Sequence, residues 1–83
     1  MKILYFAWLR TRIGTGQEQL DLPGHVATVG DLVGWLRERS PRHAEALAHD
    51  QVVKVAVNQE HVGYDHPVTA SDEVALFPPV TGG

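Results

Sequence analysis

The chain has 83 residues, a formal net charge of −3 and no cysteine. This length suits a single domain, and a hydrophobic content of 43% supports a small core and excludes a disordered chain. Without cysteine there is no disulfide framework, no cysteine-based zinc or iron–sulfur site and no thiol nucleophile. The mildly acidic charge argues against a nucleic-acid partner, and no apolar run approaches the ~20 residues that cross a bilayer. We therefore expect a cytoplasmic protein with no membrane contact.

The first part of the chain predicts a β-hairpin. Residues 2–9 are rich in β-branched, aromatic and aliphatic side chains, which favours a strand that ends at the polar stretch 10–17. Residues 17–22 predict a second strand paired with the first, and Pro23-Gly24 ends it.

The middle of the chain predicts a main helix and a shorter one. Thr28 is suited to cap the main helix, and Asp31 three residues later forms a near capping box and complements the helix dipole. The apolar residues after this cap recur at the spacing of one helix face: Val29, Leu32, Val33 and Leu36. Ser40 and Pro41 then predict the cap and first residue of a short helix that runs to about Ala48.

The second half predicts three strands. Residues 52–57 favour a strand with Val53, Val55 and Val57 on one face, and residues 58–60 form a turn. A short strand over 61–64, a turn over 65–67 and a last strand over 73–77 follow. The element order is that of an α+β fold: a mixed sheet with one main helix packed on one face and a short second helix.

The other face of this sheet is predicted to be apolar. Phe6, Ala56, Ala75 and Phe77 alternate onto it, and a contiguous apolar patch usually marks an interaction site. The alternative is that the short helix or a loop covers it.

The last six residues predict a thin projecting tail. Pro78 and Pro79 end the last strand and favour an extended path away from the sheet. Gly82 and Gly83 have no side chains and fit a narrow channel, and the tail ends in a carboxylate. The alternative is a frayed terminus.

Elsewhere the chain has no recognisable catalytic constellation. Ser40 and Ser71 have cap or turn explanations, and the glycines follow neither nucleotide-binding pattern. The histidines are scattered and are expected to be ordinary surface residues rather than metal ligands: His25, His43, His49, His61 and His66.

The last third of the chain carries specific motifs. Residues 55–59 are Val-Ala-Val-Asn-Gln, residues 65–67 are Asp-His-Pro, and residues 72–83 are Asp-Glu-Val-Ala-Leu-Phe-Pro-Pro-Val-Thr-Gly-Gly. Near the start, Tyr5-Phe6-Ala7 and Arg10 followed by Gly14-Thr15 fit the same pattern. In these motifs the chain resembles the small, sulfur-carrying subunit of molybdopterin synthase, the MoaD family. The resemblance implies a ubiquitin-like β-grasp: residues 1–83 would form one sulfur-carrier domain, with 78–83 as its tail.

The resemblance also implies a chemistry for the tail. An E1-like adenylating enzyme would use ATP to join AMP to the Gly83 carboxylate, and a sulfur donor such as a cysteine desulfurase would then leave a thiocarboxylate on Gly83. The tail, residues Pro78, Pro79, Val80, Thr81, Gly82 and Gly83, would enter the large synthase subunit. There the sulfur would pass to precursor Z to build the dithiolene of molybdopterin. The chain would bind no cofactor or metal and would not be catalytic alone.

The resemblance further implies a partner surface. Phe6, Arg10, His61 and Phe77 match positions that the family uses against its partners, the large subunit being held in a two-plus-two heterotetramer. Leu76 stands where a second aromatic residue is common, and His61 where an apolar residue is common. We therefore expect altered partner affinity rather than lost function.

Three other functions stay open at this point. One is a sulfur carrier for another pathway, such as thiamin thiazole synthesis, although the Phe-Pro-Pro-Val segment argues against it. Another is a ubiquitin-like modifier whose Gly83 becomes linked to lysines. The last is a plain binding module with a frayed tail.

Overall fold

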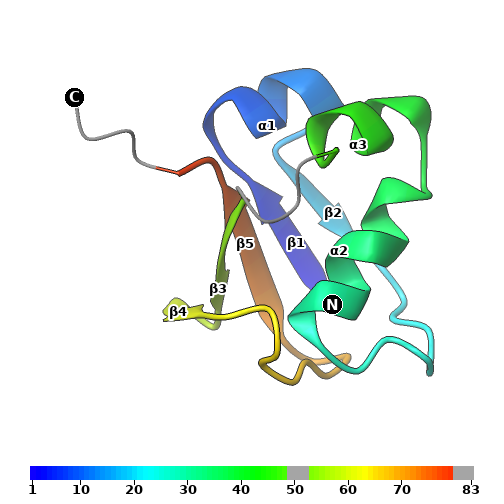
Figure 1. The fold of residues 1–83 in the computed structure, drawn as a ribbon, viewed down its shortest axis with the longest axis vertical. Coiled ribbons are helices and arrows are strands. Elements are labelled where there is room, and N and C mark those ends of the chain that lie inside the picture. The colour runs from blue at the N-terminus through cyan, green and yellow to red at the C-terminus, as the bar shows by residue number, and fades with distance from the viewer. Residues whose placement is uncertain (49–52, 80–83) are drawn as a thin grey trace.

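The computed structural model describes residues 1–48 and 53–79. Within them the chain forms three helices and five strands (Figure 1). Their order is β1 (Lys2–Tyr5), α1 (Ala7–Ile13), β2 (Gln17–Gln19), α2 (Val29–Arg37), α3 (Pro41–Ala46), β3 (Lys54–Val57), β4 (Glu60–Val62) and β5 (Glu73–Phe77).

The strands form one mixed sheet in the order β2-β1-β5-β3-β4. The central pair, β1 and β5, is parallel, with Lys2 opposite Glu73 and Tyr5 opposite Leu76. The other neighbouring strands are antiparallel. This confirms the predicted α+β class and mixed sheet.

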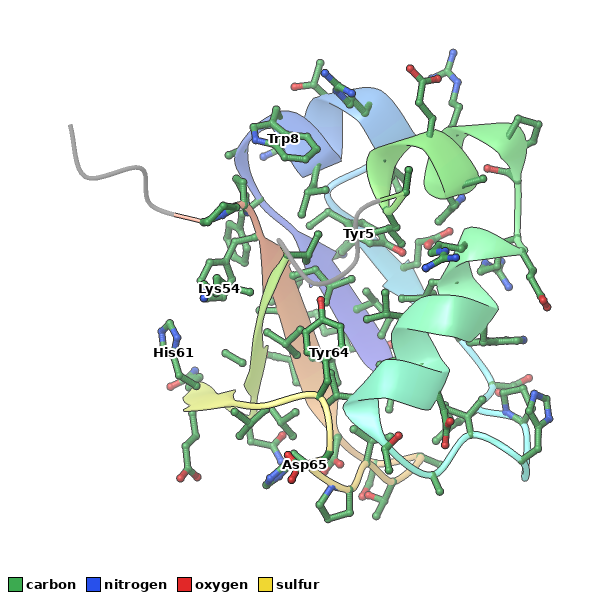
Figure 2. All side chains as sticks on the ribbon, in the orientation of Figure 1. Tyr5, Trp8, Lys54, His61, Tyr64 and Asp65 are labelled. Carbon is green, nitrogen blue, oxygen red and sulfur yellow. The ribbon has the colours of Figure 1, made fainter. Side chains whose placement is uncertain are left out.

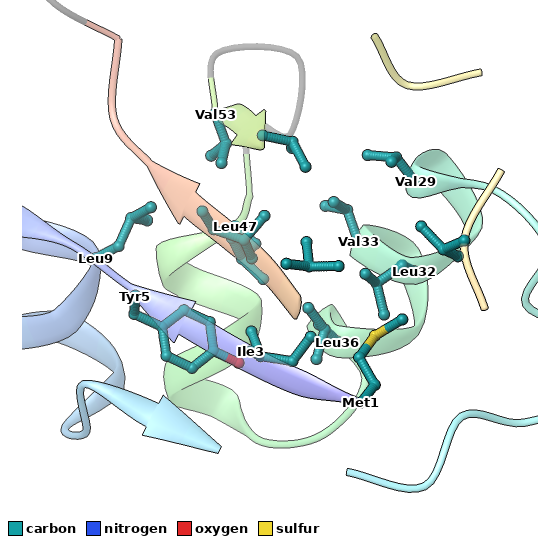
Figure 3. Close-up of a cluster of buried hydrophobic side chains, with 14 of the residues drawn as sticks. Met1, Ile3, Tyr5, Leu9, Val29, Leu32, Val33, Leu36, Leu47 and Val53 are labelled. Carbon is teal, nitrogen blue, oxygen red and sulfur yellow. The ribbon is translucent and has the colours of Figure 1, made fainter. Parts of the chain in front are cut away.

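The main helix begins and packs as predicted. The Thr28 hydroxyl accepts a hydrogen bond from the Asp31 N–H at 3.2 Å, and the Asp31 carboxylate accepts one from the Thr28 N–H at 3.2 Å. These two bonds complete a capping box at the start of α2. The apolar face of the helix is fully buried: Val29, Leu32, Val33 and Leu36. It packs with Ile3 and Tyr5 in one hydrophobic core (Figure 3).

The prediction for residues 6–17 is wrong, because a helix stands where a strand end and a loop were expected. β1 stops at Tyr5, and α1 follows over Ala7–Ile13. Leu9 and Ile13, four residues apart, both reach the core, while Thr11 between them is exposed. A strand would place all three on one face, so this pattern fits only a helix. Gly14 then takes a left-handed conformation with φ of 96°, and its N–H donates to the Arg10 carbonyl. This is a helix end that glycine favours.

Other boundaries differ by a few residues. β2 ends at Gln19 rather than at residue 22, β4 covers Glu60–Val62 rather than 61–64, and α3 ends at Ala46 rather than near 48. Residue 52, the predicted start of the third strand, lies outside the described residues, and β3 begins at Lys54. The last strand matches its predicted bounds.

The β3–β4 hairpin closes through a two-residue turn. Asn58 and Gln59 have φ of 51° and 71°, and Val57 pairs with Glu60 on either side of them. Positive φ at both central residues matches the right-handed twist of the flanking strands.

A buried polar network ties α3 to the sheet. The Tyr5 hydroxyl donates to Glu18 Oε2 at 2.6 Å, and His43 Nε2 lies 3.0 Å from the same oxygen. His43 Nδ1 is 2.7 Å from the Ser40 hydroxyl, so imidazole with its proton on Nε2 donates to the carboxylate and accepts from the serine. His43 is 7% exposed, so the prediction that it is a surface residue is wrong.

The network shifts the pKa of two of its members. Burial is the main cause that raises the pKa of Tyr5, and the hydrogen bond to Glu18 adds to it. Burial by itself would raise the pKa of Glu18, but hydrogen bonds from Tyr5 and His43 outweigh it, so that pKa lies below its usual value.

Replacing the shared acceptor tests this network. Glu18→Ala leaves the Tyr5 hydroxyl, on a side chain only 1% exposed, without its acceptor. We expect the free energy of unfolding at pH 7 to fall by about 1–3 kcal/mol, measured by urea denaturation. Because the pKa of Glu18 is lower in the folded state, its contribution is present above the unfolded pKa and is lost as pH falls through the folded pKa. The difference between the two proteins should therefore shrink in acid.

The neighbouring exposed Gln17 provides the control, since Gln17→Ala should change stability by less than about 0.5 kcal/mol. A difference between wild type and Glu18→Ala that grows as the pH falls would contradict the assigned sign.

Candidate functional site

The sheet face that points away from the core carries three rows of side chains. The strand register places the middle row across all five strands: Gln17, Leu4, Ala75, Ala56 and His61. On one side of it lies a polar row that includes Lys2 opposite Glu73. On the other side, towards the end of β5, Phe77 stands opposite Lys54. Apolar surface thus collects at the end of β5 where residue 78 follows.

Phe77 is held by a neighbour from the edge strand. The His61 ring packs edge-on against the Phe77 ring, with centroids 5.2 Å apart and planes at 77°. Figure 2 shows His61 and Lys54 together on the side of the sheet away from α2. The structure therefore brings together two of the four predicted partner residues, His61 and Phe77.

Phe6 lies next to this pair. Its backbone N–H donates to the Leu76 carbonyl at 3.1 Å, so the β1–β5 pairing continues one residue beyond Tyr5. Its side chain is 48% exposed, which is unusual for a phenylalanine. We call Leu4, Phe6, Ala75, Phe77 and His61 the aromatic face.

The aromatic face is open within the described residues. The short helix α3 packs against α1 and α2, and neither it nor another described segment lies over this face (Figure 1). The prediction of a free outer face is correct for Phe6, Ala75 and Phe77. It is wrong for Ala56, which is only 6% exposed because its side chain is short and its cross-strand neighbours are Ala75 and His61.

Arg10 does not join the aromatic face. It lies on α1 beside a surface hollow lined by Thr11, Gly14, Thr15 and Gly16.

Trp8 is an exposed aromatic residue that the sequence prediction placed on a strand. It is 42% exposed on the first turn of α1, and the Arg12 guanidinium lies 5.0 Å from its ring centroid. Leu9 and Ile13 occupy the buried side of the same helix. Their four-residue spacing with the polar Thr11 between them, followed by Gly14, is the signal that could have identified this helix and the exposed side on which Trp8 lies.

The tail begins directly after β5. Pro78 and Pro79 are half-buried and extend the chain beyond the strand without further pairing. The predicted tail residues Val80, Thr81, Gly82 and Gly83 lie outside the described residues.

In the described parts of the chain, no three histidine, aspartate or glutamate side chains come together as metal ligands. None of the helices there has the length and apolar character to cross a membrane.

A five-stranded mixed sheet with a capped helix on one face, and with parallel first and last strands at its centre, defines a ubiquitin-like β-grasp protein. The chain belongs to the ThiS family, whose model matches residues 3–83. It is 43% identical over 83 residues to the molybdopterin synthase sulfur carrier subunit of Escherichia coli strain K12, covering 100% of this chain and 99% of that protein. The protein of the same name from Dictyostelium discoideum is 36% identical over 84 residues, covering 99% and 94%.

A solved structure has the same fold. The crystal structure of H. volcanii small archaeal modifier protein 1 superposes with a TM-score of 0.74 at 31% identity, covering 96% of this chain and 97% of that one. The resemblance and the β-grasp fold expected from the motifs are confirmed.

Backbone strain marks the junction between Phe6 and Trp8. Ala7 has φ of 54°, a left-handed conformation that costs a residue with a Cβ about 1–2 kcal/mol. Ala7→Gly should raise the free energy of unfolding by about 0.5–1 kcal/mol, because relief of this strain exceeds the added entropy of glycine in the unfolded chain. Chemical denaturation measures the change.

Ala44→Gly is the matched control, since Ala44 is exposed on α3. The same substitution in a regular helix should lower stability by about 1 kcal/mol. Equal losses in both variants would mean that Ala7 is not strained.

Proposed function

We propose that this chain is the sulfur carrier subunit of a molybdopterin synthase, with the sulfur held at Gly83. The observation that carries the proposal is the 43% identity, over essentially the full length of both chains, to a protein of that name. The open aromatic face at the end of β5 supports it, because a partner seated there is next to the start of the tail.

The chemistry follows from the leaving group. A carboxylate is a poor acceptor for sulfur, because oxide is a bad leaving group. When a Gly83 carboxylate oxygen attacks the α-phosphorus of ATP, pyrophosphate leaves and an acyl-adenylate forms. Sulfur at the oxidation level of sulfide then attacks the carbonyl carbon and displaces AMP. The product is a thiocarboxylate, a sulfur nucleophile that needs no cysteine in this chain.

The residues of the tail suit its delivery. Pro78 and Pro79 cannot donate to a sheet ladder, so they separate the tail from β5. Gly82 and Gly83 lack side chains, so they pass through a narrow channel into a partner's active site. We propose that Val80 and Thr81 pair through their backbone with that channel.

Two partners would then use the same face in turn. An E1-like adenylating enzyme and the large synthase subunit each have to hold the carrier while the tail occupies their active site. Phe6, His61 and Phe77 would anchor the carrier through the aromatic face, with Arg10 as a separate contact. The sulfur would pass to precursor Z in the large subunit, in a two-plus-two assembly. A cysteine desulfurase is the proposed donor. Its persulfide holds sulfane sulfur, so an external thiol has to release it as sulfide, with a disulfide forming between that thiol and the desulfurase cysteine.

A second function deserves a test because of one structural neighbour. H. volcanii small archaeal modifier protein 1 has the same fold at 31% identity. A modifier would use the same activated Gly83, but its acceptor would be a lysine amine. A thiamin-type carrier, the other function suggested by the ThiS family model, would differ only in the acceptor of the sulfur.

Intact mass measures the central step. After incubation with ATP, an adenylating enzyme and a sulfur source, one oxygen of the chain should be replaced by one sulfur. The large subunit and precursor Z should then return the mass to its starting value as sulfur leaves. Lysine adducts in place of this cycle would favour the modifier.

Deletion of Gly83 should abolish sulfur loading while leaving the midpoint of thermal unfolding unchanged, because the tail is proposed to lie outside the core. Loading of the truncated chain would contradict Gly83 as the acceptor, and a large loss of stability would contradict a separate tail.

Phe77→Ala tests the aromatic face. We expect the dissociation constant for the large subunit to rise at least tenfold, as for an aromatic hot spot, while stability falls by only about 1 kcal/mol because Phe77 is half-buried. Titration calorimetry measures the first and urea denaturation the second. Gln19→Ala, in the polar row of the same sheet face, should leave both unchanged.

A stability loss of about 3–5 kcal/mol would instead identify Phe77 as a core residue.

A further inference from the structure

Positive charge is concentrated at one part of an otherwise acidic chain. The net charge is −3, yet all five arginines lie between residues 10 and 42. Two of them, Arg10 and Arg42, come together around the segment from Gly14 to Gly16, which joins α1 to β2. A surface hollow of about 320 Å³ lies here, lined by Arg10, Thr11, Gly14, Thr15 and Gly16.

The two glycines make room for the two guanidinium groups. A Cβ on Gly16 would lie 3.0 Å from Arg10 Nε, and one on Gly14 would lie 2.8 Å from Arg42 Nη1. Gly14 also has the positive φ of a helix end, but Gly16 does not have a left-handed conformation. The backbone at Gly16 therefore accepts other residues, and what a side chain there would disturb is the position of Arg10.

The hydrogen-bond donors around this hollow have no partner among residues 1–48 and 53–79. Among the described residues, neither Arg10 nor Arg42 has a carboxylate partner or donates a side-chain hydrogen bond. The backbone N–H groups of Thr15 and Gly16 also donate no hydrogen bond there. Two exposed guanidinium groups and two backbone N–H groups without a partner among the described residues thus lie around one short segment.

The helix dipoles of α1 and α3 favour the placement of only one of these two arginines. Arg10 is in the last turn of α1, where a cation offsets the negative end of the helix dipole. Arg42 is the second residue of α3, at the positive end, where a cation is disfavoured, and the first turn of α3 has no acidic residue. An anion bound between Arg42 and Arg10 would offset this unfavourable placement.

We propose that Arg10, Arg42 and the Gly14–Gly16 backbone form a binding site for the phosphate group of a small molecule. Guanidinium forks match phosphate oxygens in geometry and charge, and backbone N–H groups beside glycine approach them closely. A phosphate dianion has enough oxygen atoms to accept hydrogen bonds from several donors at once, whereas a carboxylate has only two oxygen atoms. The site is separate from the aromatic face and from the tail.

Nuclear magnetic resonance tests the site on the full-length protein. Inorganic phosphate is titrated at constant ionic strength, with sodium chloride as the balancing salt. The amide signals of Thr15 and Gly16 should shift and saturate, and chloride alone should not move them in a saturable way. A second titration uses AMP: at least fivefold tighter binding than phosphate identifies a nucleotide as the source of the phosphate group, and equal binding identifies the phosphate group alone.

Matched variants distinguish specific phosphate binding at this site from nonspecific electrostatic attraction of anions to the protein. Arg42→Gln should weaken phosphate binding at least fivefold, and so should Gly16→Ala, which alters no charge and displaces Arg10. Arg39→Gln removes the same charge from a side chain that lies over Trp35 and should weaken binding less than twofold. Circular dichroism checks that each variant is folded.

The proposal would be overturned by shifts that do not saturate, by equal weakening in Arg42→Gln and Arg39→Gln, or by unchanged binding in a folded Gly16→Ala variant. Saturable binding of a glutamate-rich peptide, with none of phosphate, would also overturn it and would identify an acidic protein partner instead.

Discussion

The parallel pairing of β1 with β5 is the interaction on which the rest of this structure depends. It joins residues 2–5 to residues 73–76 at the centre of the sheet, so the two ends of the described chain stabilise each other. Parallel strands point the same way, and both β1 and β5 therefore finish at the same edge. Phe6 and Phe77 reach solvent there, and the chain continues into Pro78. One pairing thus places the exposed aromatic side chains beside the start of the tail.

The helices cover the sheet from one side only. The buried faces of α1 and α2 and the inner residues of β1 and β5 share one core. The network of Tyr5, Glu18 and His43 adds a polar connection between α3 and strands β1 and β2. With all three helices engaged there, the opposite face is left open by the described residues. A small domain that leaves one sheet face uncovered buries less surface, so its remaining contacts have to be well satisfied.

Local patterns predicted some elements well and others badly. The capping residues and apolar spacing of α2 are signals that lie within one segment. The alternation of side chains between the two faces of β5 is another such signal, and both elements were predicted correctly. The helix α1 was missed because residues 2–9 form one apolar run, in which β-branched and aromatic residues favour a strand. Tertiary burial of Leu9 and Ile13 overrides that preference.

Contacts between distant residues could not be predicted in this way. His43 meets Glu18 across 25 positions, and neither residue carries a local motif that indicates the other. The pairing of His61 with Phe77 is similar, because it depends on the register of three strands. Family resemblance identified Phe6, His61 and Phe77 of the aromatic face, and strand alternation identified Ala75. Their arrangement, and the place of Leu4 among them, required the fold.

Net charge is a poor description of what this surface can bind. A charge of −3 argues against a polyanion such as nucleic acid, which has to be matched over a long surface. A single phosphate group needs only two or three donors at one point, and the screening length of about 8 Å at physiological salt makes distant carboxylates a weak influence there. Arg10 and Arg42 reach the same short segment because α1 and α3 pack together, and Gly16 and Gly14 between α1 and β2 leave room for them. The same packing that gives α1 its place in the core therefore creates a local positive site on an acidic protein.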